Sequence, residues 1–439
     1  MADDSSHKHR QKRLRRGSGD EEDLLAGRSS ALSESSSSLA EGDPRTFRLR
    51  GVPLDWSVDD VRSFLEKNHR SSVPIIRSLA HEIDGQSKTS TITFEGTVSL
   101  PTSMWYLPLP KLFETQPARE VPLDDNFYGI TTLFAPPLED HEVDVIAISG
   151  LGGHAFGSFK ERGRNYMWLR DALPNDLIGD KAHRPAARVM IYGYESTTVG
   201  SRNMQNLEDL ATSFHSSLLA LVDSPSMKPI IFIAHSLGGL IVKQVNKQAI
   251  IALSKSQSKS DSQLIQAIYG LIFFGVPNSG MDITSLVPMI GDGPSRPLID
   301  AISSINSQIL TMQQREFPSA LGGVEDSEMF CFYETLESPT AQNVNGKWSM
   351  TGRATILVTK FSATHCRPWE SGPEHICAVA RTHSDMVKFG PEDHEYSKVR
   401  QRIKGLARRA SLKMDPLSPD PGQSEMFKDL QGQSEFLGS

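Results

Sequence analysis

Ser236 lies in a segment whose residue types and spacing suit a nucleophile. The apolar run 229–234 is typical of a buried strand, and a helical pattern follows the serine. A serine on so sharp a strand-to-helix turn needs small residues two positions before and after it, and Ala234 and Gly238 meet this need. We therefore predict a nucleophile at Ser236. The alternative is an ordinary turn whose serine caps the helix.

Acyl transfer by a serine also requires donors for a developing oxyanion. One expected donor is the backbone N–H of Leu237, directly after the nucleophile. The second is expected in the glycine-rich loop 149–154, which follows the apolar run 143–148, and its position there points to Leu151. A nucleotide-binding loop is the competing interpretation, but the glycine spacing is not G-x-G-x-x-G and no Lys-Ser/Thr pair follows.

The general base is expected to be a histidine after the last strand, which we predict at 354–358. The histidines beyond this run are His365, His375, His383 and His394. His383 precedes an amphipathic stretch, 385–389, and so occupies a predicted loop-to-helix junction. His365 is too close to the predicted strand end, and His394 lies beyond the helix start. His383 is therefore the predicted base.

Two carboxylates are candidates for the acid that orients this histidine. Glu334 follows the apolar run 329–333, at a strand end where a carboxylate could face His383. Asp282 follows the preceding strand and its turn, a position that some lipases use. We prefer Glu334 and keep Asp282 as the alternative.

The elements that must position these residues are short apolar runs separated by helical stretches. Runs of this kind are typical of strands buried on both faces in a mainly parallel sheet. The predicted strands are 143–148, 187–192, 229–234, 268–275, 329–333 and 354–358. The predicted helices are 166–173, 204–222, 239–253 and 298–314.

A small α+β module is predicted before this domain, at 44–97. A strand at 46–50, a helix capped by Ser57 and two strands around Gly85 suggest a ferredoxin-like piece, as in RNA-recognition modules. Arg48 stands where such modules carry a base-stacking aromatic residue, so we expect a packing or partner-binding role instead. The other predicted units are a disordered tail at 1–43, an extended linker at 98–140, the main domain at 141–409 and a disordered tail at 410–439.

Composition narrows the class of protein. The net charge of −7 argues against a general nucleic-acid binder. Three cysteines form no disulfide framework, their spacing with nearby histidines fits no zinc pattern, and no apolar run reaches the length of a membrane span. The basic block 8–16 is compatible with a solvated tail, a nuclear-import signal or contact with an anionic membrane surface. We expect a cytoplasmic protein without a metal or cofactor.

Seven sequence blocks between about Asp124 and Phe389 resemble one group of α/β-hydrolases. They are 144–154, 167–171, 192–195, 231–240, 274–278, 332–335 and 383–389. In order and spacing they are similar to the serine-active-site-containing lipase-like proteins and the GPI inositol-deacylase branch, whose fungal chains often precede nucleotide-binding or repeat regions. The resemblance implies an α/β-hydrolase fold, with Ser236 and His383 matching the group's serine and histidine. Ser149, where many members have histidine, and Ala234, where most have glycine, depart from its pattern.

Two functional hypotheses follow. The first is a serine ester hydrolase that cleaves a lipid or other acyl ester, with the apolar segment 283–290 either lining an acyl pocket or packing in the ordinary way. The second is a hydrolase-fold module that has lost turnover and serves signalling or partner recruitment. A covalent serine probe distinguishes them.

Overall fold

The structure is a computed structural model of the chain. It describes residues 45–68, 72–95, 104–110, 119–179, 183–198, 200–222, 227–256, 259–284, 286–305, 307–322, 327–367 and 372–413. The tail predicted at 1–43 lies outside the described residues, as does 414–439 of the tail predicted at 410–439.

The larger part of the molecule is built on a seven-stranded sheet in the order β14-β11-β10-β9-β7-β8-β6. Six strands are parallel, and β6, at one edge, is antiparallel to β8. The strands are β6 (Gly129–Phe134), β7 (Val143–Ile148), β8 (Ala187–Gly193), β9 (Ile230–His235), β10 (Ile268–Phe274), β11 (Glu328–Glu334) and β14 (Ile376–Val379).

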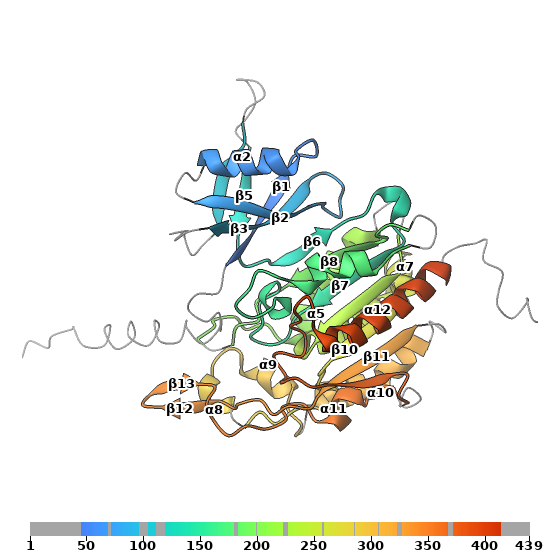
Figure 1. Cartoon of the computed structure of the whole chain (residues 1–439). Coiled ribbons are helices and arrows are strands. Elements are labelled where there is room, and N and C mark those ends of the chain that lie inside the picture. Colours follow the sequence, from blue (N-terminus) through green and yellow to red (C-terminus); the bar gives the residue numbers. More distant parts are fainter. Residues whose placement is uncertain are drawn as a thin grey trace, which may run out of the picture.

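Helices cover both faces of this sheet (Figure 1). Because side chains alternate across a strand, each central strand contributes to two cores. Ile146 and Phe232 belong to one core, with α5 (Leu207–Val222), α6 (Leu237–Ser256), α7 (Lys259–Ala267), α9 (Arg296–Ala301) and α10 (Gln308–Gly322). Val145 and Ile233 belong to the other, with α3 (Trp168–Asp171), α4 (Leu173–Asp176) and α12 (His394–Lys413).

The remaining elements are short. They are α8 (Val287–Ile290), α11 (Lys360–Thr364), the 3-10 turns η1 (Leu138–Asp140) and η2 (Gly157–Phe159), and a separate hairpin of β12 (Gln342–Val344) and β13 (Lys347–Ser349). Among the described residues, no helix is both long enough and apolar enough to cross a membrane.

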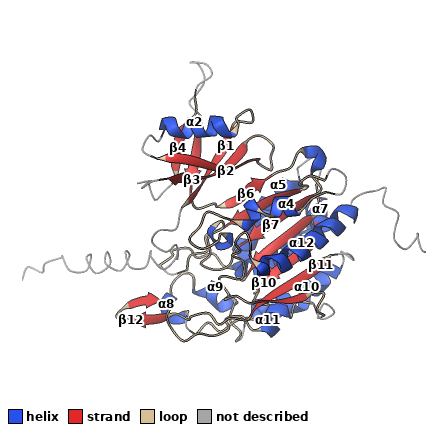
Figure 2. Cartoon of the chain, viewed as in Figure 1, coloured by secondary structure: helices blue, strands red, loops and turns tan. Residues whose placement is uncertain are grey.

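A second, five-stranded sheet precedes the large one, in the order β2-β3-β1-β5-β4, and one helix, α2 (Val58–Asn68), packs on it (Figures 1 and 2). Its strands are β1 (Thr46–Val52), β2 (Val73–His81), β3 (Lys88–Glu95), β4 (Trp105–Pro108) and β5 (Glu120–Asp124). Strands β2 and β3 also contact β6, so this module lies against the antiparallel edge of the large sheet.

Several predicted elements differ from the structure. The run 354–358 is not a strand of the large sheet, whose last strand is β14. Residues 383–387 form turns instead of starting a helix, and α9 and α10 replace the single helix predicted at 298–314.

The segments around the predicted main domain differ as well. The ferredoxin-like arrangement is not confirmed, since β4 and β5 enlarge the small sheet and α2 is the one helix described in this module. The segment 98–140, expected as an extended linker, supplies β4, β5 and β6. Strands β4 and β5 pair within the small sheet, and β6 pairs with β8 of the large one. Helix α12 continues four residues beyond the predicted boundary at 409.

Candidate active site

Ser236 occupies the turn between β9 and α6, in the middle of the sheet. Its φ of 53° is in the left-handed region, which costs a serine on the order of 1–3 kcal/mol and persists only where the surroundings impose it. Here its N–H donates to the Phe274 carbonyl at 2.9 Å, extending the pairing of β9 with β10 by one residue. The turn leaves the side chain just accessible, with 7% of Ser236 exposed.

Two glycines allow the chain to pass this close to the serine. A Cβ on Gly238 would lie 2.7 Å from the Ser149 carbonyl oxygen and 2.8 Å from that of Ile148. A Cβ on Gly150, in the loop after β7, would lie 2.6 Å from the Ser236 Cβ. The glycine-rich loop 149–154 therefore lies directly against the nucleophile turn.

His383 reaches the serine from the loop after β14. Its Nε2 lies 2.9 Å from the Ser236 Oγ. Its backbone N–H donates to the Ser338 Oγ at 3.0 Å, which fixes the loop that carries the ring. His383 is 7% exposed, so the imidazole is largely shielded from water.

Glu334 is the last residue of β11 and stands on the far side of the imidazole. Its Oε2 lies 2.5 Å from the His383 Nδ1. Its Oε1 accepts the backbone N–H groups of Leu357 at 2.7 Å and Val358 at 3.2 Å. The run 354–358, wrongly predicted as a strand, thus holds the carboxylate in place.

The structure does not bring Asp282, the alternative acid, to this site. Asp282 is exposed, and its carboxylate accepts the backbone N–H and hydroxyl of Thr284. Those bonds lower the pKa of the Asp282 carboxyl, through the hydroxyl first. The carboxylate that contacts His383 is that of Glu334.

His235 is a site residue that the sequence analysis missed. Its Nε2 donates to the His383 carbonyl at 2.9 Å, and the two ring centroids are 4.9 Å apart. Burial, and then positive charge on His383, hold the pKa of His235 well below its usual value, so the ring is neutral near pH 7. The available signal was a polar residue at the end of an otherwise apolar strand, directly before the serine.

The two expected oxyanion donors lie in segments that adjoin the serine. Leu237 is the first residue of α6, so its N–H has no acceptor within the helix and lies at the positive end of the helix dipole. Leu151 follows Gly150 in the loop against Ser236, and its N–H makes no hydrogen bond with the described residues. Both amides are available to a ligand oxygen.

The other candidate histidines serve different contacts. His365 stacks on Phe361, His375 bonds the Met329 carbonyl, and His394 pairs with Glu395. In the described part of the chain no three His, Cys, Asp or Glu side chains converge as metal ligands would. The three cysteines are free thiols.

No protein-family model and no curated protein matches this chain. Solved structures similar to it include phospholipase PlaB from Legionella pneumophila in complex with thio-NAD, at 11% identity and a TM-score of 0.35, over 64% of each chain. The chain therefore spans less than two thirds of that phospholipase. Lipase BlEst2 from Bacillus licheniformis in mature form is 10% identical, with a TM-score of 0.34 over 60% of this chain and 93% of that one.

The peroxisomal alpha-beta-hydrolase Lpx1 from Saccharomyces cerevisiae is 11% identical, with a TM-score of 0.34 over 77% of this chain and 97% of that one. Likeness at this level says nothing of substrate or mechanism, which must come from this chain's own residues. The sheet order and the strand–turn–helix context of Ser236 are those of an α/β-hydrolase-like fold.

Proposed function

We propose that this protein is a serine hydrolase that cleaves a lipid or another acyl ester. The observation that carries the proposal is the unbroken hydrogen-bonded chain from the Ser236 Oγ through both ring nitrogens of His383 to Glu334. A nucleophile, a base in contact with it and an acid that orients the base are the parts that acyl transfer requires. They come from three separate strand ends, β9, β14 and β11.

Each group has a defined part in the reaction. The Ser236 Oγ attacks the ester carbonyl while its proton passes to the His383 Nε2, and the Glu334 carboxylate stabilises the imidazolium through Nδ1. The backbone N–H groups of Leu237 and Leu151 donate to the oxyanion of the tetrahedral intermediate. His383 then returns the proton to the leaving alkoxide. Water then attacks the acyl-serine through the same steps, with His383 again as the base, and the carboxylic acid is released.

An apolar acyl group suits the apolar segment that follows the strand next to β9. Three partly buried side chains that pack against the core, Ile283, Leu286 and Ile290, follow β10, the strand beside β9. They offer a surface on which an acyl chain loses contact with water, which stabilises binding by about 25 cal/mol per Å² of apolar area.

A fluorophosphonate probe tests the proposal. Wild-type protein is expected to label, and the Ser236→Ala and His383→Ala variants are expected to label at least 100-fold more slowly. Ser216→Ala, which removes an exposed hydroxyl on α5, is the matched control and should label like wild type. Absence of labelling in wild type, or equal labelling of Ser236→Ala, would contradict the proposal and favour a recruitment module without turnover.

A further inference from the structure

A five-residue turn, Asp124–Tyr128, joins the small sheet to the edge of the large one. It begins at the last residue of β5 and ends directly before β6. Phe127 at its centre has a φ of 57° and is fully buried, stacked against Phe156 with ring centroids 5.1 Å apart. A non-glycine residue keeps this conformation only where its surroundings impose it, so the turn has one defined shape.

Arg48, on β1 of the small sheet, fixes this turn from one side. Its guanidinium makes a two-pronged contact with the Asp124 carboxylate at 2.9–3.1 Å and donates to the Tyr128 carbonyl at 2.9 Å. It also donates to the Thr131 hydroxyl at 2.7 Å and lies 5.4 Å from the Phe127 ring centroid. Arg48 is 3% exposed, so these contacts are shielded from water and salt.

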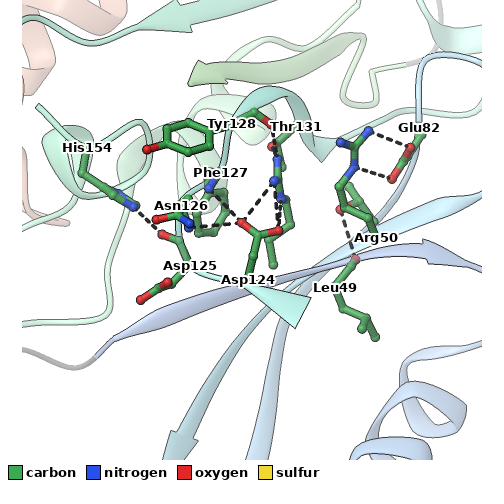
Figure 3. Close-up of polar contacts among 12 residues, drawn as sticks. Leu49, Arg50, Glu82, Asp124, Asp125, Asn126, Phe127, Tyr128, Thr131 and His154 are labelled. Atoms are coloured by element: carbon green, nitrogen blue, oxygen red, sulfur yellow. Dashed lines mark hydrogen bonds and ion pairs between the residues drawn. The ribbon is translucent and has the colours of Figure 1, made fainter. Parts of the chain in front are cut away.

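His154 meets the same turn from the other side. Its Nε2 donates to the Asp125 carbonyl at 2.5 Å, and its Nδ1 accepts the Gly157 N–H at 2.9 Å. Figure 3 shows the His154 ring pointing at Asp125, with Asp124 and Phe127 beside it. Using one nitrogen as donor and the other as acceptor selects the neutral tautomer with hydrogen on Nε2.

His154 is also the last residue of the loop 149–154, which carries Leu151. The first part of this loop is held by groups that follow β8. The Tyr194 hydroxyl donates to the Ser149 carbonyl at 3.0 Å, and the Gly152 N–H donates to the Ser196 carbonyl at 2.9 Å. The far end has two contacts: the Ser196 hydroxyl donates to the Gly153 carbonyl at 2.5 Å, and His154 donates to the turn that Arg48 fixes.

We propose that Arg48 and His154 are positioning residues through which the small module sets the place of the Leu151 N–H beside Ser236. This inference rests on the proposed function and adds a regulatory connection to it. Movement of β1 shifts the turn, the turn shifts His154, and the loop 149–154 follows. The appended module is then a control element for the oxyanion site, and a ligand or partner that displaces it lowers turnover.

Substitutions at the two ends of this connection test it. His154→Phe keeps a ring against Phe127 but removes both hydrogen bonds, whereas His154→Gln keeps a donor near the position of Nε2. Arg48→Lys keeps the charge and loses the two-pronged contact. We expect His154→Phe and Arg48→Lys each to lower kcat for a p-nitrophenyl ester about 10-fold with KM within twofold, because an oxyanion donor acts only in the transition state. His154→Gln should stay within threefold of wild type.

Two further measurements separate positioning from general loosening of the fold. The double variant Arg48→Lys/His154→Phe should lose little more kcat than either single variant, since both act on one connection. Backbone amide exchange over 149–157 should be faster in Arg48→Lys than in Arg50→Met, a control on the same strand whose side chain contacts Glu82. Additive losses in kcat, or exchange over 149–157 equal to wild type, would overturn the inference.

The exchange measurement does not depend on activity. Should wild type show no Ser236-dependent hydrolysis, the proposed function fails while amide exchange still decides whether the module holds the loop. If Arg48→Lys does not fold, His154→Phe provides the same comparison, because His154 is exposed and its replacement leaves the Arg48 contacts intact.

Discussion

At the scale of single residues, Glu334 differs from Asp282 because both of its carboxylate oxygens make hydrogen bonds within the site. We expect Glu334→Gln to lower kcat on the order of 10³–10⁴-fold. If the amide oxygen keeps the Leu357 and Val358 N–H groups, the NH₂ faces Nδ1 and forces the hydrogen of His383 onto Nε2, where it cannot accept the serine proton. Turnover of a p-nitrophenyl ester measures the effect.

Asp282→Asn is the matched control, because it changes a carboxylate to an amide at an exposed position after the neighbouring strand. Its kcat should equal that of wild type within twofold. A large loss in Asp282→Asn together with a small one in Glu334→Gln would reverse the assignment of the acid.

His235 makes the free energy of unfolding depend on pH. Its pKa is lowered in the folded state, first by burial and then by His383, so the unfolded chain binds one more proton once the pH falls below about 6.5. The contribution of His235 to the free energy of unfolding is therefore fully present above that pH. It decreases as the pH falls, by at most about 1.4 kcal/mol per pH unit. Urea unfolding between pH 7 and pH 5 should show a shallower decrease in His235→Gln. Parallel curves would contradict this assignment.

At the scale of elements, the turn between β9 and α6 depends on a residue without a side chain. We expect Gly238→Ala to reduce the melting temperature and kcat together, because the new Cβ would meet two backbone oxygens of β7 and the loop after it, at 2.7 and 2.8 Å. Backbone atoms cannot rotate away, so the loop 149–154 must shift. Thermal unfolding and ester turnover measure the two effects.

Gly405→Ala is a control substitution within a helix, and its expected effect on stability is opposite to that of Gly238→Ala. Gly405 lies in α12, and its added Cβ would contact the flexible end of Arg409 at 3.3 Å. Alanine should raise stability by about 0.5–1 kcal/mol there and leave kcat unchanged. Gly238→Ala behaving like Gly405→Ala would show that the turn tolerates a side chain.

At the scale of the whole molecule, the two sheets meet through a polar cluster beside an open cleft. The cleft has a volume of about 270 Å³ and is lined by residues of both parts, among them Arg50, Glu82, Ile130 and Ser217. We expect Arg48→Met to lower the free energy of unfolding by about 3–5 kcal/mol, because it leaves the buried Asp124 carboxylate without its counter-charge.

Arg50→Met should change that free energy by about 1 kcal/mol or less. The Arg50 side chain is 40% exposed and its closest approach to Glu82 is 3.5 Å. Urea denaturation of the two variants compares a buried with a solvated ion pair on one strand. Equal destabilisation would mean that the Arg48 cluster does not hold the two parts together.

Most of the central architecture follows from the pattern of apolar residues along the chain. Strands buried on both faces must be apolar throughout, so the bounds of β7, and nearly those of β8 to β11, could be read from composition. The small residues around Ser236 also indicated its turn, and Gly238 leaves room for the end of β7 and the loop after it, whose backbone oxygens lie 2.7 and 2.8 Å from the position of an added Cβ. The pattern of apolar residues predicted strands wrongly in two places. The apolar run 354–358 belongs to a loop, and β14 was missed because it is short and only partly buried.

Which polar side chains meet depends on how distant segments of the chain pack together. Glu334 ends one strand and Asp282 follows another, and nothing local distinguishes them as partners of His383, because the contact of Glu334 with His383 joins residues 49 positions apart. The contacts of His235 and Arg48 could not be predicted for the same reason. The partner of His235 lies 148 residues away, and those of Arg48 lie 76 or more residues away. Apolar periodicity is a property of neighbouring residues, whereas hydrogen bonds, ion pairs and the close approach of the loop 149–154 to Gly238 depend on distances set by the packing of distant segments.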